Sequence, residues 1–142
     1  MNEVTRPAVP TVGQVMSPEP ILIRVDQPLQ EAARILEENE VSGVPVVDQA
    51  GVLVGVLSDT DLVRARATED LWSRWPDLSV RDLMHSPVIT ADRSMTVTEA
   101  ATLMERAHVH RLVVVADDQQ TAIGIISTSD LVRAMLGERE GG

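Results

Sequence analysis

The chain has 142 residues and a mass of 15.4 kDa, enough for one compact domain that buries roughly two-thirds of its unfolded surface. A formal net charge of −10 and a pI near 4.6 argue against a nucleic-acid partner, because contacts to the phosphate backbone need clustered cations. Cysteine is absent, which excludes disulfides and thiolate chemistry. No apolar stretch reaches the roughly 20 residues of a membrane-spanning helix, and the N-terminus has no signal pattern, so we expect a cytoplasmic protein without membrane contact.

Aromatic residues are scarce, with two tryptophans and neither phenylalanine nor tyrosine. A bound purine would therefore be lined by aliphatic side chains and backbone, because few rings are available to stack on it. All twelve basic residues are arginine, a bias that we ascribe to genome composition except where an arginine accompanies other signals of a site.

The sequence contains an internal duplication. Residues 55–65 return as residues 124–134, with the glycine, the first serine, the second aspartate and the closing Leu-Val-Arg-Ala unchanged. The match extends back to Met16 and Met84, and its register slips by one residue in the polar turn at 116–121, where an insertion is tolerated. The pattern predicts two supersecondary units of the same design.

The first repeat has the pattern strand, helix, strand, strand, helix. Its apolar run at 21–23 predicts a short strand, and Pro28 predicts the start of a helix whose apolar residues keep helical spacing. Residues 44–47 and 52–57 predict a pair of strands joined by a turn that contains Gly51. The closing helix begins within the duplicated run.

The connection between the repeats, residues 68–79, is polar except at its two tryptophans and one proline. Trp72 and Trp75 either mark a patch that binds a partner or pack over the edge of the core and fix how the halves meet. We expect the second role, because exposed tryptophan is rare.

The second repeat follows the same order. Thr96 and Glu99 predict a capping box at the start of a helix, and residues 112–115 and 122–126 repeat the strand pair. The predicted segments are a flexible N-terminal stretch, the first repeat, a linker, the second repeat and a flexible C-terminal tail: residues 1–11, 12–67, 68–79, 80–136 and 137–142.

A hydroxyl and a carboxylate stand at the same spacing in both copies of the run. Ser58 with Asp61, and Ser127 with Asp130, fit a helix cap in which serine and acid satisfy amides of the first turn. Capping alone explains either copy. A helix N-terminus with an extra hydroxyl also favours phosphate, and a carboxylate suits ribose hydroxyls, while glycine lets a backbone approach the strand closely. The extra hydroxyls and the glycines are Thr60, Ser129, Gly55 and Gly124.

The span from Val15 to Leu136 resembles a tandem pair of cystathionine-β-synthase (CBS) domains, the regulatory unit called a Bateman module. The resemblance rests on Met-Ser-Pro at 16–18, on residues 41–48 and on the two duplicated runs. Residues 110–115 resemble the corresponding segment in the gamma subunit of AMP-activated protein kinase. The resemblance implies an α/β (α+β) fold of two pseudo-twofold-related repeats, each a small three-stranded sheet with two helices.

The resemblance also implies two nucleotide-binding clefts, each built from both repeats. Cleft A combines Ile21, Val41, Ser42, Gly43, Val44, Ser127, Ser129 and Asp130. Cleft B combines Ile89, Val109, His110, Arg111, Leu112, Ser58, Thr60 and Asp61. Only cleft B carries a fork-shaped phosphate donor, Arg111, for which a surface ion pair is the alternative role.

Neither a metal site nor a catalytic centre is predicted. His108 and His110 lie two residues apart on or near a strand, and we expect them to face opposite sides and not to share a metal ion. His85 is expected to be a solvated loop residue. Asp59 and Asp61 flank a hydroxyl and are candidates for a Mg²⁺ site, but the second repeat lacks the paired acid, and no His, Lys or Cys lies near in sequence.

The sequence therefore predicts a non-catalytic sensor, without a cofactor, that binds AMP, ADP or ATP and signals by changed helix packing or assembly. S-adenosylmethionine and NADH are alternative ligands. Its output passes to an unidentified protein partner or to its own homodimer. The alternative function is a ligand-free oligomeric scaffold subunit of the same fold. The helix residues that either contact a dimer partner or fill the interface between repeats are Leu62, Val63, Leu131, Val132 and Met135.

Overall fold

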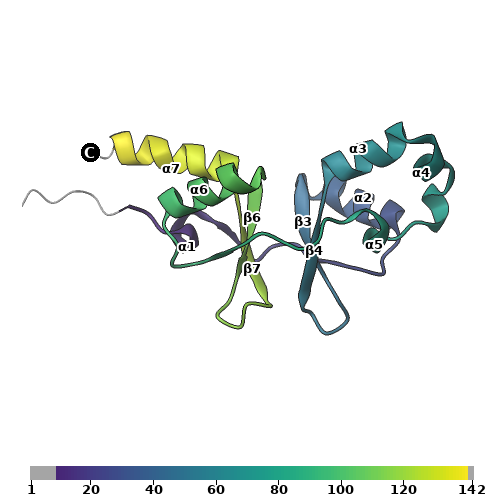
Figure 1. Cartoon of the computed structure of the whole chain (residues 1–142), viewed down its shortest axis with the longest axis horizontal. Helices are drawn as coiled ribbons and strands as arrows, with labels where there is room; N and C mark the ends of the chain where they lie inside the picture. The colour runs from purple at the N-terminus through teal and green to yellow at the C-terminus, as the bar shows by residue number, and fades with distance from the viewer. Residues whose placement is uncertain (1–8, 141–142) are drawn as a thin grey trace, which may run out of the picture. The chain divides into compact units, whose positions relative to one another are not determined.

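The computed structural model describes residues 9–140, which form two compact units (Figure 1). No helix in this part of the chain is long and apolar enough to cross a bilayer. In chain order the elements are α1 (Val12–Val15), β1 (Ser17–Pro18), β2 (Ile23–Arg24), α2 (Leu29–Glu38), β3 (Gly43–Val47), β4 (Leu53–Ser58), α3 (Asp59–Ala67), α4 (Glu69–Ser73), the 3₁₀ helix η1 (Trp75–Asp77), α5 (Val80–Leu83), β5 (Thr90–Asp92), α6 (Val97–Ala107), β6 (Arg111–Val115), β7 (Ala122–Ser127) and α7 (Thr128–Glu140).

Unit 2 consists of Pro20–Val88 with Gln120–Ala122 and contains the sheet β2-β3-β4. β2 runs parallel to β3, and β3 runs antiparallel to β4. The turn between β3 and β4 passes through Gly51, which has φ of 84° and donates its N–H to the Asp48 carbonyl at 3.0 Å. Glycine tolerates this left-handed conformation without steric cost. The predicted strand pair and its glycine turn are therefore confirmed.

Helix α2 lies against this sheet through one apolar face. It begins after Pro28, as the sequence predicts, and buries Leu29, Ala32 and Leu36 at helical spacing. Full burial of a leucine side chain is worth about 1.5–3 kcal/mol, so this face holds the helix to the unit. The core of unit 2 comprises Ile23, Val25, Leu29, Ala32, Leu36, Val44, Val46, Leu57, Ala65, Leu78, Val80 and Leu83.

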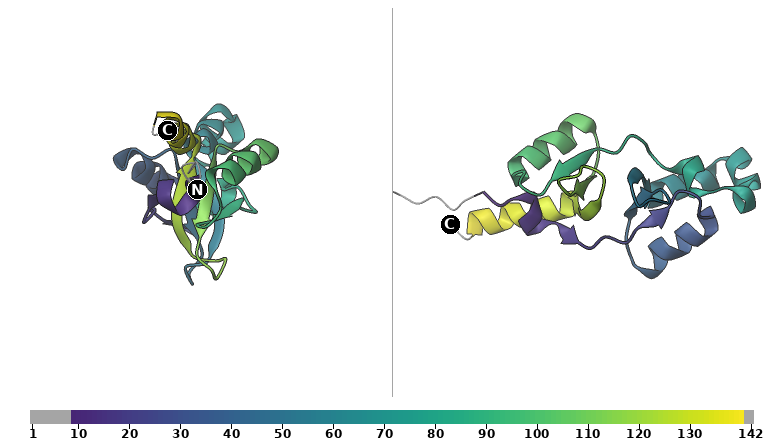
Figure 2. Two further views of the ribbon diagram at one scale, coloured as in Figure 1. Left: turned by 90° about the vertical axis from the view of Figure 1, so that its left-hand side faces the viewer. Right: turned by 90° about the horizontal axis from the view of Figure 1, so that it is seen from below.

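Unit 1 consists of residues 9–19, Ile89–Gln119 and 123–140, and contains the sheet β1-β7-β6-β5. β5 runs parallel to β6, and the two-residue β1 runs antiparallel to β7. Helix α7 packs beside α1 and α6 (Figure 2). The predicted capping box of Thr96 and Glu99 is present at the start of α6. The core comprises Val12, Ala91, Val97, Ala100, Met104, Leu112, Val114, Ile126 and Leu131. The predicted mixed α/β fold is confirmed.

Each unit takes its opening segment from the other sequence repeat. α1 and β1 open the first repeat but belong to unit 1, where β1 pairs with β7 and the Val12 N–H donates to the Met95 carbonyl at 2.7 Å. α5 opens the second repeat but belongs to unit 2, where the Val80 N–H donates to the Gln27 carbonyl at 2.9 Å. The compact units therefore do not coincide with the sequence repeats.

The opening segments pass close to the two repeated glycines, Gly55 and Gly124. A Cβ on Gly55 would lie 3.0 Å from the His85 carbonyl oxygen, and a Cβ on Gly124 would lie 3.0 Å from that of Ser17. A Cβ at either distance would be tightly crowded, and the carbonyl would have to shift by a few tenths of an ångström. The predicted close approach of backbone to the strand is thus confirmed, but the approaching backbone belongs to the protein itself.

The linker is structured, because it folds into α4 and η1. Trp75 packs against the core of unit 2 and donates Nε1–H to Gln30 Oε1 at 2.8 Å. Trp72 is exposed, and both the Arg66 guanidinium, at 4.6 Å, and the Trp75 ring, at 5.4 Å, lie near its ring centroid. Packing over the core, the role that we expect for both tryptophans, is therefore observed for Trp75.

Both predicted flexible ends fall partly outside the described residues, at 1–8 and 141–142. At the N-terminal side the Pro10 carbonyl accepts the Val97 N–H at 3.0 Å, and Thr11 bridges to Thr96. At the C-terminal side α7 continues to Glu140, three residues beyond the predicted start of the tail at 137. Regular structure thus extends into both segments.

Candidate functional site

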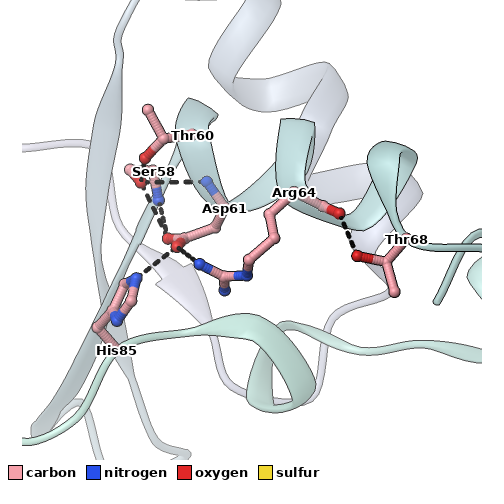
Figure 3. Close-up of polar contacts among 6 residues, drawn as sticks. All are labelled: Ser58, Thr60, Asp61, Arg64, Thr68 and His85. Atoms are coloured by element: carbon pink, nitrogen blue, oxygen red, sulfur yellow. Dashed lines mark hydrogen bonds and ion pairs between the residues drawn. The ribbon is translucent and has the colours of Figure 1, made fainter.

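The first half-site, called the Asp61 half-site, consists of Ser58, Thr60 and Asp61, where β4 runs into α3 (Figure 3). Asp61 Oδ2 accepts from the backbone N–H of Ser58 at 2.8 Å and from its hydroxyl at 2.9 Å. The Asp61 N–H lies 3.4 Å from Ser58 Oγ, and the hydroxyls of Ser58 and Thr60 are 2.8 Å apart. The capping interpretation of the serine and aspartate is therefore correct for this copy.

The second oxygen of Asp61 contacts two further side chains. Its Oδ1 is hydrogen-bonded to His85 Nε2 and lies 3.3 Å from Arg64 Nη1 (Figure 3). The Asp61 side chain is wholly buried, at 0% exposed, whereas that of His85 is 63% exposed. An ionised carboxylate only accepts hydrogen bonds, so the imidazole donates from Nε2. A buried carboxylate is thus enclosed by donors from its own unit.

The sequence prediction of a solvated loop residue holds for the exposure of His85, but it misses the backbone pairing of His85 and its contact with Asp61. Its backbone forms an antiparallel bridge with Val56, in which each residue donates to the other's carbonyl, at 2.8 and 3.0 Å. The bridge directs the imidazole toward Asp61. The sequence offered one signal for this role. The residue after the aligned methionines Met16 and Met84 differs between the repeats, being Ser17 in the first and His85 in the second.

The second half-site, called the Asp130 half-site, consists of Ser127, Ser129 and Asp130, where β7 runs into α7. Asp130 Oδ2 accepts from the Ser127 N–H at 2.8 Å and from its hydroxyl at 3.0 Å, as in the first copy. Oδ1 accepts from Arg133 Nη1 at 3.2 Å. The Asp130 side chain is 11% exposed, and Ser17 occupies the strand position that His85 has in the other unit.

The turns before β3 and β6 lie against these helix starts. The Asp59 N–H donates to the Ser42 carbonyl at 2.8 Å in unit 2, and the Thr128 N–H donates to the His110 carbonyl at 3.0 Å in unit 1. Cleft A and cleft B each combine residues of unit 1 with residues of unit 2. The assignment of residues to the two clefts therefore stays a prediction.

The predicted aliphatic lining divides into buried and half-buried positions. Val44 and Leu112 belong to the cores of their units, so only their backbones are available to a ligand. The remaining lining side chains pack partly buried against the same cores. These are Ile21 and Val41 in unit 2, and Ile89 and Val109 in unit 1.

His108 and His110 line one groove in unit 1, so the expectation that they face opposite sides is wrong; even on a strand, residues two apart share a face. His108 is not a strand residue: it ends α6 in a left-handed conformation, with φ of 55°. The groove encloses about 500 Å³ beside α6 and α7. Among the residues that the structure describes, no group of three His, Asp or Glu side chains is placed to hold a metal ion.

The candidate Mg²⁺ pair does not form a common site. Asp59 is exposed, whereas Asp61 is buried and hydrogen-bonded to unit 2. Residues two apart on a helix do not face each other, which separates the two carboxylates. The fold does bring a histidine, His85, next to Asp61 although none is near in sequence, but its Nε2 is engaged by that carboxylate.

Comparison with known proteins gives two matches to the CBS domain model, over residues 12–68 and 80–137. The CBS domain-containing protein YhcV of Bacillus subtilis is 30% identical over 132 residues, covering 92% of this chain and 90% of that protein.

Solved structures also resemble this chain. CBSX2 in complex with AMP is 32% identical, with a TM-score of 0.78, over 92% of this chain and 98% of that one. The protein CBSX2 is from Arabidopsis thaliana. The CBS domain pair of protein MJ0100, in complex with 5′-methylthioadenosine and S-adenosyl-L-methionine, is 27% identical. Its TM-score is 0.82, over 92% of this chain and 99% of that one.

Proposed function

Because this chain belongs to the CBS domain family, we propose that it is a regulatory module that binds an adenine nucleotide and carries out no reaction. The ligands named in the two similar structures, AMP, 5′-methylthioadenosine and S-adenosyl-L-methionine, share an adenosine group. The common chemistry is a purine joined to a ribose with two hydroxyls. A site for this class therefore needs an acceptor for the ribose.

The observation that carries the proposal is the unfilled acceptor capacity of Asp130. A carboxylate has about four lone-pair positions, and three protein donors reach Asp130: the Ser127 N–H, the Ser127 hydroxyl and Arg133 Nη1. The fourth position suits a ribose hydroxyl. The hydroxyls of Ser127 and Ser129, with the N-terminus of the long helix α7, favour a phosphate nearby.

The absence of catalysis is part of the proposal. Asp61 already engages His85, the imidazole placed nearest to it, and Asp59 points to solvent. No pair of an acid and a free base is thereby assembled at the described half-site of unit 2. Binding and release, rather than bond cleavage, would then be the chemical event.

The pairing of half-sites with the opposite repeat stays part of the proposal. We propose that Arg111 contacts the phosphate of the nucleotide whose ribose bonds Asp61. A double-mutant cycle tests this with AMP: Arg111→Ala and Asp61→Ala should couple, while Arg111→Ala and Asp130→Ala should be additive. Coupling with Asp130 instead would reverse the assignment.

The proposed output is a change in helix packing or assembly, with a homodimer as the assembled form. Leu131 lies in the core of unit 1, and Leu62 packs half-buried on the core of unit 2, so both contribute to packing within their own units. Val63, Val132 and Met135 are 67%, 54% and 59% exposed. Exposed apolar side chains on helices are candidates for such contacts. Light scattering of the Met135→Glu variant tests the homodimer.

A second candidate function is a ligand-free interaction subunit. It is favoured by the Asp61 half-site, where protein donors already surround the carboxylate, and by the exposed apolar residues of α7. In this alternative the duplicated serine and aspartate only cap helices. The same fold would then serve assembly alone.

A thermal-shift panel separates the two functions. A ligand present at 100 times its dissociation constant stabilises the folded state by about 2.7 kcal/mol, which a melting curve resolves. AMP, ADP, ATP, S-adenosylmethionine and NADH are each added to the full chain, with guanosine monophosphate as the control. We expect a rise in Tm with at least one adenine compound and none with the control. No rise with any adenine compound contradicts the sensor function.

A further inference from the structure

We propose that His85 is a built-in occupant of the Asp61 half-site, which a ribose must displace before a nucleotide binds there. The inference rests on the proposed function and adds a residue that sets the two half-sites apart. His85 would determine which half-site binds nucleotide first. Its imidazole closes the Asp61 half-site, whereas the Asp130 half-site has no such side chain and stays open.

Both carboxylate oxygens of Asp61 already have protein partners. The Ser58 N–H and hydroxyl bind Oδ2, while His85 Nε2 and Arg64 Nη1 face Oδ1. Three hydrogen bonds and an ion pair with Arg64 at 3.3 Å thus surround a carboxylate with no exposed surface. A ribose hydroxyl has nowhere to donate unless one of these partners leaves.

The Asp130 half-site lacks the corresponding donor. Ser17 pairs with Ile125, two residues before the capping Ser127, and His85 pairs with Val56, two residues before the capping Ser58. Ser17 and His85 therefore occupy equivalent positions on equivalent strands. Gly124 and Gly55 give the two carbonyls the same close approach. The side chain is what differs at this position.

The His85 side chain is free to move away. It is 63% exposed, and the Arg64 side chain is 51% exposed, so both can turn into solvent. Because Asp61 itself is buried, the cost of releasing the imidazole is met only when a ribose hydroxyl takes over its hydrogen bond to Oδ1. The imidazole thus competes with a ligand without blocking the half-site permanently. Nucleotide would fill the Asp130 half-site first and the Asp61 half-site at higher concentration.

An exchange of the two side chains tests the proposal. AMP is titrated calorimetrically into the full chain and into three variants: His85→Ser, Ser17→His and the doubly exchanged protein. For His85→Ser we expect AMP to bind the Asp61 half-site about tenfold more tightly, equivalent to about 1.4 kcal/mol. For Ser17→His we expect a comparable weakening at the Asp130 half-site. The double exchange should invert the order of filling.

The Asp130→Asn background isolates the Asp61 half-site, so that the effect of His85→Ser is read there alone. Unchanged or weaker AMP binding after His85→Ser in that background overturns the proposal, while binding by the parent chain leaves the sensor function intact. If AMP binds neither the parent chain nor any variant, the sensor function itself fails.

A second measurement does not depend on the variants folding. During an AMP titration of the parent chain, the ¹⁵N resonance of His85 Nε2 should shift only after the first equivalent is bound. A shift that follows the first equivalent, or no shift up to saturation of both half-sites, also overturns the proposal.

Discussion

The two half-sites share one capping geometry and differ in what surrounds the carboxylate. In both, the serine N–H and hydroxyl bind Oδ2 of the aspartate, and an arginine one turn later reaches Oδ1. In the Asp61 half-site a histidine adds a further contact and burial is complete. Duplication therefore preserved the local helix cap, while the residue on the neighbouring opening segment changed access to it.

The largest expected effect on AMP affinity comes from removal of the Asp130 carboxylate, which has an acceptor position left for a ribose hydroxyl. Asp130→Ala should weaken the tighter AMP site about 10- to 100-fold, because hydrogen bonds to a charged group are worth about 1.5–3 kcal/mol. Calorimetric titration measures this loss, and circular dichroism checks that the variant remains folded. Asp61→Ala is the matched control and should leave the tighter site nearly unchanged. The opposite pattern would show that Asp61 holds the first nucleotide.

The next largest effect tests a feature that both units share, the close contact between a strand glycine and the opening segment. Gly55→Ala and Gly124→Ala each place a Cβ 3.0 Å from the carbonyl of an opening segment, so each should lose stability. We expect a decrease in unfolding free energy of about 1–3 kcal/mol for both, measured by denaturant titration.

Gly137→Ala is the control for the two glycine variants, because no atom within 4 Å meets the added Cβ. Alanine at this position of α7 should be neutral or stabilise the helix by up to about 1 kcal/mol. If the Gly55 and Gly124 variants are as stable as this control, the opening segments do not press on the strands as described.

The smallest expected effect concerns the side-chain cap at the start of α6, which the equivalent helix α2 lacks. Glu99 accepts from the Thr96 N–H at 3.0 Å and its hydroxyl at 3.1 Å, and these bonds lower the pKa of Glu99 from its ordinary value of 4.5. Pro28 holds the equivalent position before α2 and gives no side-chain cap. Because the folded pKa lies below the unfolded one, the contribution is complete above pH 4.5 and is lost as the pH falls through the folded pKa.

An NMR titration of Glu99 measures that difference. In the Thr96→Ala variant the pKa of Glu99 should rise toward 4.5, because the hydroxyl bond is removed. An equal pKa in the parent chain and the variant would mean that the hydroxyl contributes nothing to the cap.

The features that sequence predicts well are local ones. The strand pair around Gly51, the start of α2 after Pro28 and the capping box of Thr96 and Glu99 depend on residues a few positions apart. Alternation, helical spacing and capping patterns record these relations directly. For the same reason both serine and aspartate caps could be recognised from their spacing.

The main feature that sequence missed is the contact between His85 and Asp61. It arises because the segment that opens each repeat packs into the unit of the other repeat. The contact between His85 and Asp61 spans 24 residues and exists because α5 and His85 join unit 2. Gly55 indicated a close backbone, but nothing nearby in sequence identified His85 as its partner. His108 is a separate case: it ends α6 in a left-handed conformation, which the sequence pattern did not indicate.

The most direct test of the central claim is a crystal structure of the full chain grown with one equivalent of AMP. The account predicts AMP with its ribose hydroxyl on Asp130 Oδ1, while His85 Nε2 remains on Asp61. AMP bound first at Asp61, with His85 displaced and Asp130 free of ligand, would contradict it.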